Sequence, residues 1–286
     1  MKILVTGASG LVGEQVLNAA RNAGFEADGT CFRQDRKGLF RLDITDRNSV
    51  KRLVGRLNPD CIVHSAAMTN VDYCEGHKEE AWKVNVEGTR NLAESTNSCK
   101  FIYISTDYVF DGRSGPYTED SLPNPVNYYG KTKLEGEKVA SLTQDWIIAR
   151  TTWIFDFSPD TKNFVCRLAD SLKKGRIVKV PNDQIANPTL SRNLAAVILK
   201  LIQLNFSGII NISGSTRIDK YGFACAVARH FSLDASLING VNSAELGQTA
   251  QRPKNAGFRL EKIEGILGER MEPLHSTLSK FGNTLP

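Results

Sequence analysis

The sequence predicts an α/β fold: a doubly wound parallel sheet covered by helices on both faces, followed by a smaller C-terminal region. Two observations predict it. Short apolar runs alternate with longer segments of helical periodicity through residues 1–156. A glycine-rich turn directly follows the first apolar run. Continuous apolar strands joined by helices form right-handed βαβ units, so we expect both faces of the sheet to be buried.

The expected elements alternate in order along this part of the chain. The apolar or β-rich runs that read as strands span residues 2–6, 25–32, 61–67, 100–106 and 146–155. The helices expected between them span residues 13–24, 46–60, 79–98 and 129–142. The first of these helices carries an apolar stripe and stops at Gly24, and the second starts at Asp46, a good N-cap.

The pattern changes after residue 156. Prolines interrupt it, and the helices expected there, at 163–174, 191–204 and 219–230, no longer alternate with strong strands. We therefore divide the chain into 1–156 and 157–286. Residues 190–214 are expected to return to the main sheet, because the apolar run 208–214 reads as a late strand.

Composition narrows the class of protein. The chain has 286 residues, 41% of them hydrophobic and 23% charged, which is typical of a globular enzyme. The net charge of +5 is not gathered into the basic stripe that nucleic acid requires. Its six cysteines form no CxxC pair or zinc pattern, which suits reduced thiols. No apolar run reaches the roughly 20 residues that span a bilayer. We expect a cytoplasmic protein without a membrane or nucleic-acid partner.

The stretch TGASGLVG predicts a Rossmann-type dinucleotide site. Gly7 permits a tight turn, Gly10 lets the backbone approach a diphosphate, and Gly13 lets the helix pack close to the strand. Free N–H groups and the positive end of the helix dipole then face the diphosphate. The alternative is an ordinary turn between a strand and a helix. The expected contacts from this loop are Gly7, Ser9, Gly10, Leu11, Val12 and Gly13.

The residues after the second expected strand favour NADP(H). NAD-binding versions of this fold place an acid there for the ribose 2′-hydroxyl. Here Cys31 holds that place, and Arg33 follows it closely, whereas Asp28 comes too early in the strand. A guanidinium binds a 2′-phosphate through charge-assisted hydrogen bonds. The alternative for Arg33 is an ordinary solvated arginine.

Several blocks together resemble a known family. These are LDITD, HSAAMTNVDYCE, VNVEGTRNLA, STDYVFDG, YGKTKLEGE, RTTWIF and QRPKNAGF, and they span nearly the whole chain. Taken in this order, they are similar to the extended short-chain dehydrogenase/reductases, and within them to the dTDP-4-dehydrorhamnose reductase branch. The last blocks are the most diverged.

The resemblance implies a catalytic tyrosine in a YxxxK motif. Tyr129 and Lys133 satisfy it, while Tyr128 would need a lysine where Thr132 stands. Residues four apart lie on one helix face, so both side chains can meet the nicotinamide ribose. Tyr129 would donate the proton to a ketone oxygen, and the Lys133 ammonium would lower the pKa of its phenol. Lys131 reads as a solvated lysine.

Other roles follow from the same resemblance. Thr106, at the end of the fourth strand, would hydrogen-bond the substrate oxygen, with Ser105 expected to point the other way. Asn85 would support the catalytic lysine; its alternative is a helix-bending asparagine. Substrate contacts are implied for Asp107, Trp153 and Arg252, although Trp153 equally suits a core position. Further cofactor contacts are implied at Asp43, Ile44, Ser65, Ala66 and Ala67. His64 reads as a core histidine.

The resemblance implies an NADPH-dependent reductase of a 4-keto-6-deoxy nucleotide-sugar that works as a homodimer. One subgroup of rhamnose reductases binds a divalent metal through acids that include one on the first helix; here that helix has Glu14-Gln15, so no metal site is expected. Two alternatives remain: a non-catalytic regulatory subunit like that of methionine adenosyltransferase, and a nucleotide-sugar epimerase. The absence of an acid after strand two disfavours the epimerase, which keeps its NAD bound.

Overall fold

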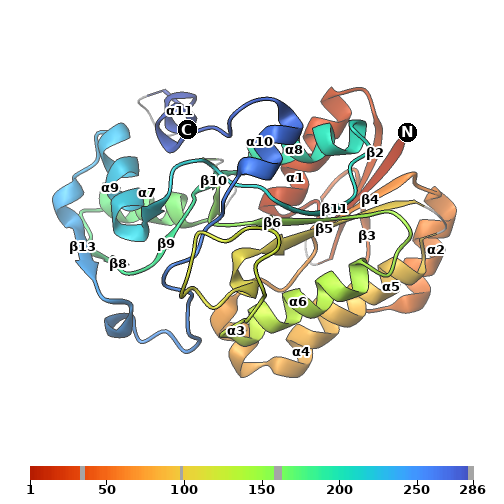
Figure 1. Ribbon diagram of the computed structural model, residues 1–286, viewed down its shortest axis with the longest axis horizontal. Helices are drawn as coiled ribbons and strands as arrows, with labels where there is room; N and C mark the ends of the chain where they lie inside the picture. Colours follow the sequence, from red (N-terminus) through yellow and green to blue (C-terminus); the bar gives the residue numbers. More distant parts are fainter. Residues whose placement is uncertain (33–35, 97–98, 158–162, 283–286) are drawn as a thin grey trace.

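A computed structural model describes residues 1–32, 36–96, 99–157 and 163–282. Its centre is a seven-stranded parallel sheet with the strand order β11-β6-β5-β4-β1-β2-β3 (Figure 1). The strands are β1 (Lys2–Thr6), β2 (Glu26–Cys31), β3 (Leu39–Arg41), β4 (Cys61–His64), β5 (Lys100–Thr106), β6 (Trp146–Thr151) and β11 (Gly208–Asn211). This arrangement confirms the predicted α/β class.

Helices cover both faces of the sheet (Figure 1). One face carries α1 (Leu11–Asn22), α8 (Ser191–Gln203) and α10 (Glu261–Leu267). The other carries α2 (Arg47–Leu57), α5 (Gly88–Glu94) and α6 (Tyr128–Ala140). The apolar stripe of α1 is buried against the strands, and so is that of α2, as the helical periodicity predicts. Asp46 caps α2 by accepting from the N–H groups of Asn48 and Ser49.

Two expected elements are interrupted in the structure. The single helix expected at 79–98 is divided into α4 (Lys78–Trp82), a π-helical turn (Lys83–Glu87) and α5. The strand expected at 146–155 ends at Thr151 and resumes as β7 (Ile154–Phe155), because Trp153 adopts a left-handed φ of 39°. Both interruptions lie where the resemblance places functional residues.

Elements that the sequence did not predict complete the fold. The short strand β3 extends the sheet beyond β2, and α3 (Val71–Gly76) precedes α4. Both are brief and lack a clear period, so tertiary contacts rather than local pattern decide them. Within the described residues no helix is long and apolar enough to cross a membrane.

A smaller group of elements lies beyond one end of the sheet, on the left in Figure 1. Its helices are α7 (Phe164–Lys173), α9 (Lys220–His230) and α11 (Leu274–Ser279), and the first two agree closely with expectation. Its strands pair as β8 (Val178–Pro181) with β13 (Ile238–Val241), β9 (Ile185–Ala186) with β12 (Ile218–Asp219) and β10 (Thr189–Leu190) with β7. Phenylalanines dominate its separate core, including Phe155, Phe157, Phe223 and Phe231. Strand β11 lies in the C-terminal part of the sequence but pairs with β6 in the main sheet.

Candidate active site

The glycine turn joins β1 to α1 in a shape that only small residues allow. Gly7 has a φ of 70°, and a Cβ there would lie 2.8 Å from the backbone N and Cα of Ala66. Gly10 precedes α1 and offers no side-chain cap to its first N–H groups, those of Leu11 and Val12. A helix start without a side-chain cap is suited to an anion, because donors and the positive dipole end point the same way.

Gly13 keeps α1 close to the carboxyl ends of the strands. A Cβ there would collide with the Gly7 carbonyl oxygen and lie 2.6 Å from Ser65 Oγ. Ser65 itself donates a 2.7 Å hydrogen bond to the carbonyl of Thr6, at the end of β1. The loop and the SAA stretch therefore meet at one edge of the sheet. Glycine at positions 7 and 13 therefore lets the turn, α1 and the SAA stretch pack closely together, as a dinucleotide-binding turn requires.

The residues expected near the adenine follow β3 at the same edge. Asp43 turns its carboxylate onto Thr45, accepting from the backbone N–H at 2.9 Å and the hydroxyl at 2.8 Å. Ile44 is buried, and a Cβ on Gly88 would lie 2.7 Å from its Cδ1. Arg33 lies outside the described residues. Arg36 is paired with Glu14 of α1 at 2.9 Å.

The start of α6 is held by its capping residue and by hydrogen bonds with two other segments. Asn127 caps it by accepting from Gly130 N at 2.8 Å and donates from Nδ2 to the carbonyl of Gln251 at 2.8 Å. Glu75, near the end of α3, accepts from Tyr128 N at 2.9 Å. A Cβ on Gly130 would collide with the carbonyl oxygen of Tyr108. Glycine at this position therefore lets the helix approach the 3-10 turn Asp107–Val109.

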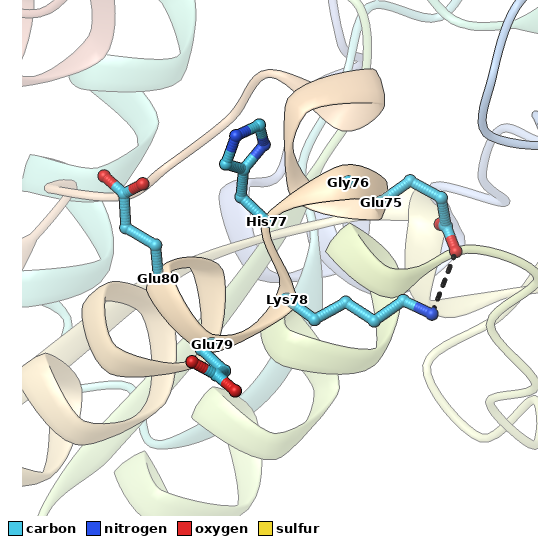
Figure 2. A pocket seen from close by; sticks show the side chains of 6 residues that line it. All are labelled: Glu75, Gly76, His77, Lys78, Glu79 and Glu80. Carbon is cyan, nitrogen blue, oxygen red and sulfur yellow. Dashed lines mark ion pairs between the residues drawn. The ribbon is translucent and has the colours of Figure 1, made fainter.

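Figure 2 shows Glu75 at the end of α3 and the residues that lead from it into α4. The six residues Glu75–Glu80 line an open hollow of about 580 Å³. Lys78 points toward Glu75, with 3.8 Å between Nζ and Oε1 (Figure 2), and its ammonium lies 5.6 Å from the centre of the Tyr128 ring. The hollow matters here through Glu75, which holds the N-terminus of α6 by accepting from Tyr128 N.

Tyr129 and Thr106 meet at the end of β5. Tyr129 is buried, and its ring packs edge-on against Tyr108 with 5.7 Å between centroids. Burial raises the pKa of the Tyr129 phenol, and the nearby Thr106 hydroxyl opposes this only in part. The sequence led us to expect Lys133 to lower this pKa. That expectation is wrong for the structure, where burial dominates and keeps the phenol protonated.

Lys133 lies one helical turn after Tyr129 and is fully enclosed. Its Nζ donates a 2.7 Å hydrogen bond to the carbonyl of Ile104 and lies 3.9 Å from the centre of the Tyr103 ring. Burial lowers its pKa to about 7, against an opposing attraction from Glu137. Lys131, in contrast, is exposed, as the sequence predicts for a solvated lysine.

Asp107 is a buried carboxyl next to Thr106. It accepts a 2.7 Å hydrogen bond from Thr152 Oγ1 and a 3.2 Å bond from Thr106 Oγ1. Burial raises its pKa to about 6 although both hydroxyls favour the charged form. Ser105, as strand alternation predicts, points elsewhere and donates to Glu137 Oε1 at 2.5 Å. Thr106 and Asp107 therefore share the side of β5 that faces Tyr129.

Asn85 sits in the π-helical turn and binds backbone rather than lysine. Its Oδ1 accepts from Met68 N at 2.8 Å, and its Nδ2 donates to Met68 O at 3.1 Å and to Thr132 Oγ1 at 2.9 Å. It thus ties the loop after β4 to the middle of α6, next to Lys133. Single π-helical turns concentrate at functional sites, which agrees with this position.

The two remaining substrate candidates lie on different elements. Trp153 is half-buried, and its ring stacks on Phe223 with 6.4 Å between centroids. Arg252 is paired with Asp72 of α3 through two hydrogen bonds of 2.8 and 2.7 Å. Its guanidinium is thereby held beside Tyr108. Any contact of Arg252 with a diphosphate would have to share or replace this pair.

His64 is a core histidine, as predicted. The Thr89 hydroxyl donates its hydrogen to the carbonyl of Asn85, so its oxygen can only accept from His64. His64 Nε2 therefore donates to Thr89 Oγ1 at 3.0 Å, and Nδ1 accepts from Thr6 Oγ1 at 2.7 Å. Burial, together with repulsion from Lys133, lowers its pKa to about 3, so it is neutral. Across the described ranges, no three His, Cys, Asp or Glu side chains gather as metal ligands do.

Sequence reasoning missed three residues that shape the site. Thr152 bonds Asp107, Glu75 holds the start of α6, and Tyr108 packs on Tyr129. Thr152 lies in the RTTWIF block and Tyr108 in STDYVFDG, so the motifs contained a signal for both. Glu75 is brought to Tyr128 only by tertiary structure, and no spacing in the sequence indicates it.

Comparison with known proteins extends over nearly the whole chain. The family model described as the RmlD substrate binding domain matches residues 1–285. The methionine adenosyltransferase 2 subunit beta of Danio rerio is 32% identical over 279 residues, covering 95% of this chain and 86% of its own. The structure of a Clostridium acetobutylicum dTDP-4-dehydrorhamnose reductase aligns with a TM-score of 0.89 at 31% identity, covering 98% of both chains. A Bacillus anthracis dTDP-4-dehydrorhamnose reductase in complex with NADP aligns with a TM-score of 0.88 at 29% identity and the same coverage.

Proposed function

Since the chain belongs to the RmlD substrate-binding domain family, we propose that it is an NADPH-dependent reductase of a 4-keto-6-deoxy nucleotide-sugar. The substrate we propose is dTDP-4-dehydro-L-rhamnose, and the product dTDP-L-rhamnose. One observation carries the proposal: Thr106, Tyr129 and Lys133, which lie on β5 and α6, are all buried at the same end of the sheet. Residues 157–286 would mainly hold the nucleotide-sugar.

The glycine turn and its neighbours fit a dinucleotide. Gly7 and Gly13 let the turn and α1 pack as closely as a dinucleotide-binding turn requires, and the start of α1 offers N–H groups without a side-chain cap. We propose that Asp43 and Ile44 flank the adenine, and that Ser65, Ala66 and Ala67 pass beneath the ribose and diphosphate. Arg33 would bind the 2′-phosphate that distinguishes NADP(H) from NAD(H).

Bound NADPH supplies a hydride to the ketone carbon, and the protein supplies the proton to the oxygen. Tyr129 suits this step because burial keeps its phenol protonated. Thr106 would hold the same ketone oxygen, which orients the carbonyl toward the phenol. Lys133 would turn from the Ile104 carbonyl toward the ribose hydroxyls, and its ammonium would stabilise the phenolate that remains after proton transfer.

A second candidate function is a regulatory subunit. The 32% identity to methionine adenosyltransferase 2 subunit beta favours it. That role requires a binding surface but not a proton donor. The complete set of Thr106, Tyr129 and Lys133 favours the reductase. The epimerase alternative is weaker, since β2 ends at Cys31 without an acid for a permanently bound NAD.

Turnover distinguishes these functions. Mixing the protein, NADPH and dTDP-4-dehydro-L-rhamnose should lower the nicotinamide absorbance, while dTDP-L-rhamnose, which has no ketone, should leave it unchanged. A screen of other nucleotide-keto-sugars tests the sugar assignment. If none oxidises NADPH and the protein co-purifies stoichiometrically with a methionine adenosyltransferase, the regulatory function replaces the reductase.

Cofactor titration tests the role of Arg33. We expect tighter binding of NADPH than of NADH, and Arg33→Ala should reduce that ratio. The exposed Arg270→Ala is the matched control and should keep it. Equal affinities in the unchanged protein would contradict the assignment to NADP(H).

A further inference from the structure

Lys220 is a lysine near Asp107 that the site described above does not use. It is the first residue of α9, and its backbone N–H donates to the carbonyl of Gln184 at 2.9 Å. The preceding Asp219 caps the helix by accepting from Gly222 N at 2.8 Å. The strand pair β9–β12 ends at this point. The backbone of Lys220 is therefore fixed, and its side chain projects from a rigid base.

Two aromatic rings hold its ammonium. Lys220 Nζ lies 4.2 Å from the centre of the Trp153 ring and 4.4 Å from that of Phe164, distances typical of cation–π contacts. Ring faces attract a cation but accept no conventional hydrogen bond from it. Among the described residues, no oxygen or nitrogen accepts a hydrogen bond from Lys220 Nζ. A half-buried ammonium has three N–H donors, and these are available to a ligand that lies beside it.

The ammonium of Lys220 lies near Asp107, next to the residues proposed to hold the ketone. Asp107 and Lys220 attract each other, and Asp107 accepts from Thr106 Oγ1 at 3.2 Å. The ring of Trp153 contacts the Lys220 ammonium, and Trp153 directly follows Thr152. The Thr152 hydroxyl also donates a hydrogen bond to Asp107. The adjoining residues Thr152 and Trp153 thus contact Asp107 and Lys220 respectively, which brings Lys220 near the residues proposed to hold the ketone.

We propose that Lys220 is a substrate-binding residue that donates hydrogen bonds to the sugar hydroxyls of the nucleotide-sugar. The inference rests on the proposed reductase function and assigns the sugar ring, rather than the diphosphate, to this lysine. The sugar is favoured because Lys220 lies near Asp107, which is hydrogen-bonded to Thr106, the residue proposed to hold the ketone oxygen, whereas the diphosphate lies farther along the substrate. Trp153 and Phe164 aim the ammonium and limit its movement.

The proton on Lys220 makes the contact sensitive to pH. Burial lowers the pKa of Lys220 to about 8, with Asp107 of the 3-10 turn raising it and Arg167 of α7 lowering it. Asp107 itself titrates lower, with a pKa of about 6. As the pH rises through 8, the ammonium loses its charge, and a hydrogen bond given by it weakens.

The test is calorimetric binding of dTDP-L-rhamnose and of dTDP to the protein saturated with NADP. Lys220→Met keeps the length and packing of the side chain, and should weaken dTDP-L-rhamnose binding by roughly 10-fold to 100-fold, the usual range for a lost hydrogen bond from a charged donor. It should leave dTDP binding unchanged. Lys220→Arg should restore most of the loss, and the exposed Lys173→Met on α7 should behave as the unchanged protein.

Raising the pH from 7 to 9 adds a readout that a purely packing role would not change. The unchanged protein should lose affinity for dTDP-L-rhamnose over this range, whereas Lys220→Met and Lys220→Arg should not. An equal loss of dTDP affinity in Lys220→Met would overturn the sugar assignment in favour of the diphosphate. Unaltered affinities in Lys220→Met would overturn the proposal outright. Failure of the unchanged protein to bind either nucleotide would instead reject the reductase function.

Discussion

Glu137 and Arg150 are joined inside the protein by two parallel hydrogen bonds, of 2.9 Å from Nε to Oε1 and 2.7 Å from Nη2 to Oε2. The two side chains are 4% and 2% exposed, so the pair is shielded from water on all sides. Glu137 lies one helical turn after Lys133, and Arg150 lies on β6. The pair therefore anchors the helix that carries Tyr129 and Lys133 to the sheet.

Breaking this pair on one side should be costly. Arg150→Met leaves a buried carboxylate without its partner, and we expect it to lower the free energy of unfolding by about 3–5 kcal/mol. The double variant Glu137→Met/Arg150→Met should cost less than Arg150→Met alone, because no buried charge remains. Urea denaturation measures both. Lys174→Met, which breaks the exposed ion pair with Asp170, is the control and should change the free energy of unfolding little. A double variant less stable than the single one would contradict this account.

The two adjacent tyrosines should differ sharply in turnover. Tyr129→Phe removes the proposed proton donor and should lower turnover of the keto-sugar by about 10²–10⁴-fold, the usual contribution of a positioned acid. NADPH affinity should change little, because the ring and helix remain. Tyr128→Phe is the matched control, since its ring faces Lys78 rather than Thr106, and its effect should be small. Greater damage from Tyr128→Phe would show that the proton comes from another group.

Lys133 is expected to serve both cofactor binding and proton transfer. Lys133→Met should reduce turnover and weaken NADPH binding together, because one ammonium is proposed to hold the ribose and to stabilise the phenolate. Lys131→Met, two residues away and exposed, should affect neither. Steady-state kinetics and a cofactor titration measure the two effects. A loss of turnover with unchanged NADPH affinity would remove the ribose contact from the proposal.

His64 should make the fold sensitive to mild acid. Its folded pKa of about 3 lies below the ordinary value near 6.5, because the buried ring cannot accept a proton. Between these values the unfolded chain binds a proton that the folded chain does not, so the contribution of His64 to stability is complete above 6.5 and falls as pH decreases toward 3. The fall should approach about 1.4 kcal/mol per pH unit.

Denaturation at pH 7.5 and pH 5 measures this effect. His64→Gln should show a smaller loss of stability between the two conditions than the unchanged protein does. His275→Gln, at an exposed position, should keep the full loss. Carboxylates contribute equally to all three proteins, so their effect cancels in the comparison. The same loss in His64→Gln as in the unchanged protein would mean that another group is responsible.

The sequence by itself determined the parallel sheet, the glycine turn and the register of the YxxxK pair. Local patterns suffice for these: continuous apolar strands require cover on both faces, and a four-residue spacing places Tyr129 and Lys133 on one face of α6. It also indicated the core position of His64 and the exposure of Lys131. It could not indicate that the helix expected at 79–98 contains a π-helical turn, because the contacts that Asn85 makes there come from Met68 and Thr132.

Only the tertiary structure decided the electrostatic state of the site. Burial, a property of the whole fold, raises the pKa of Tyr129 and lowers that of Lys133, and no spacing of residues predicts it. The same holds for pairs that join distant segments, such as Arg252 with Asp72 and Glu75 with Tyr128. The position of Lys220 between Trp153 and Phe164 also depends on three separate elements. Sequence patterns report neighbours along the chain, whereas these properties depend on neighbours in space.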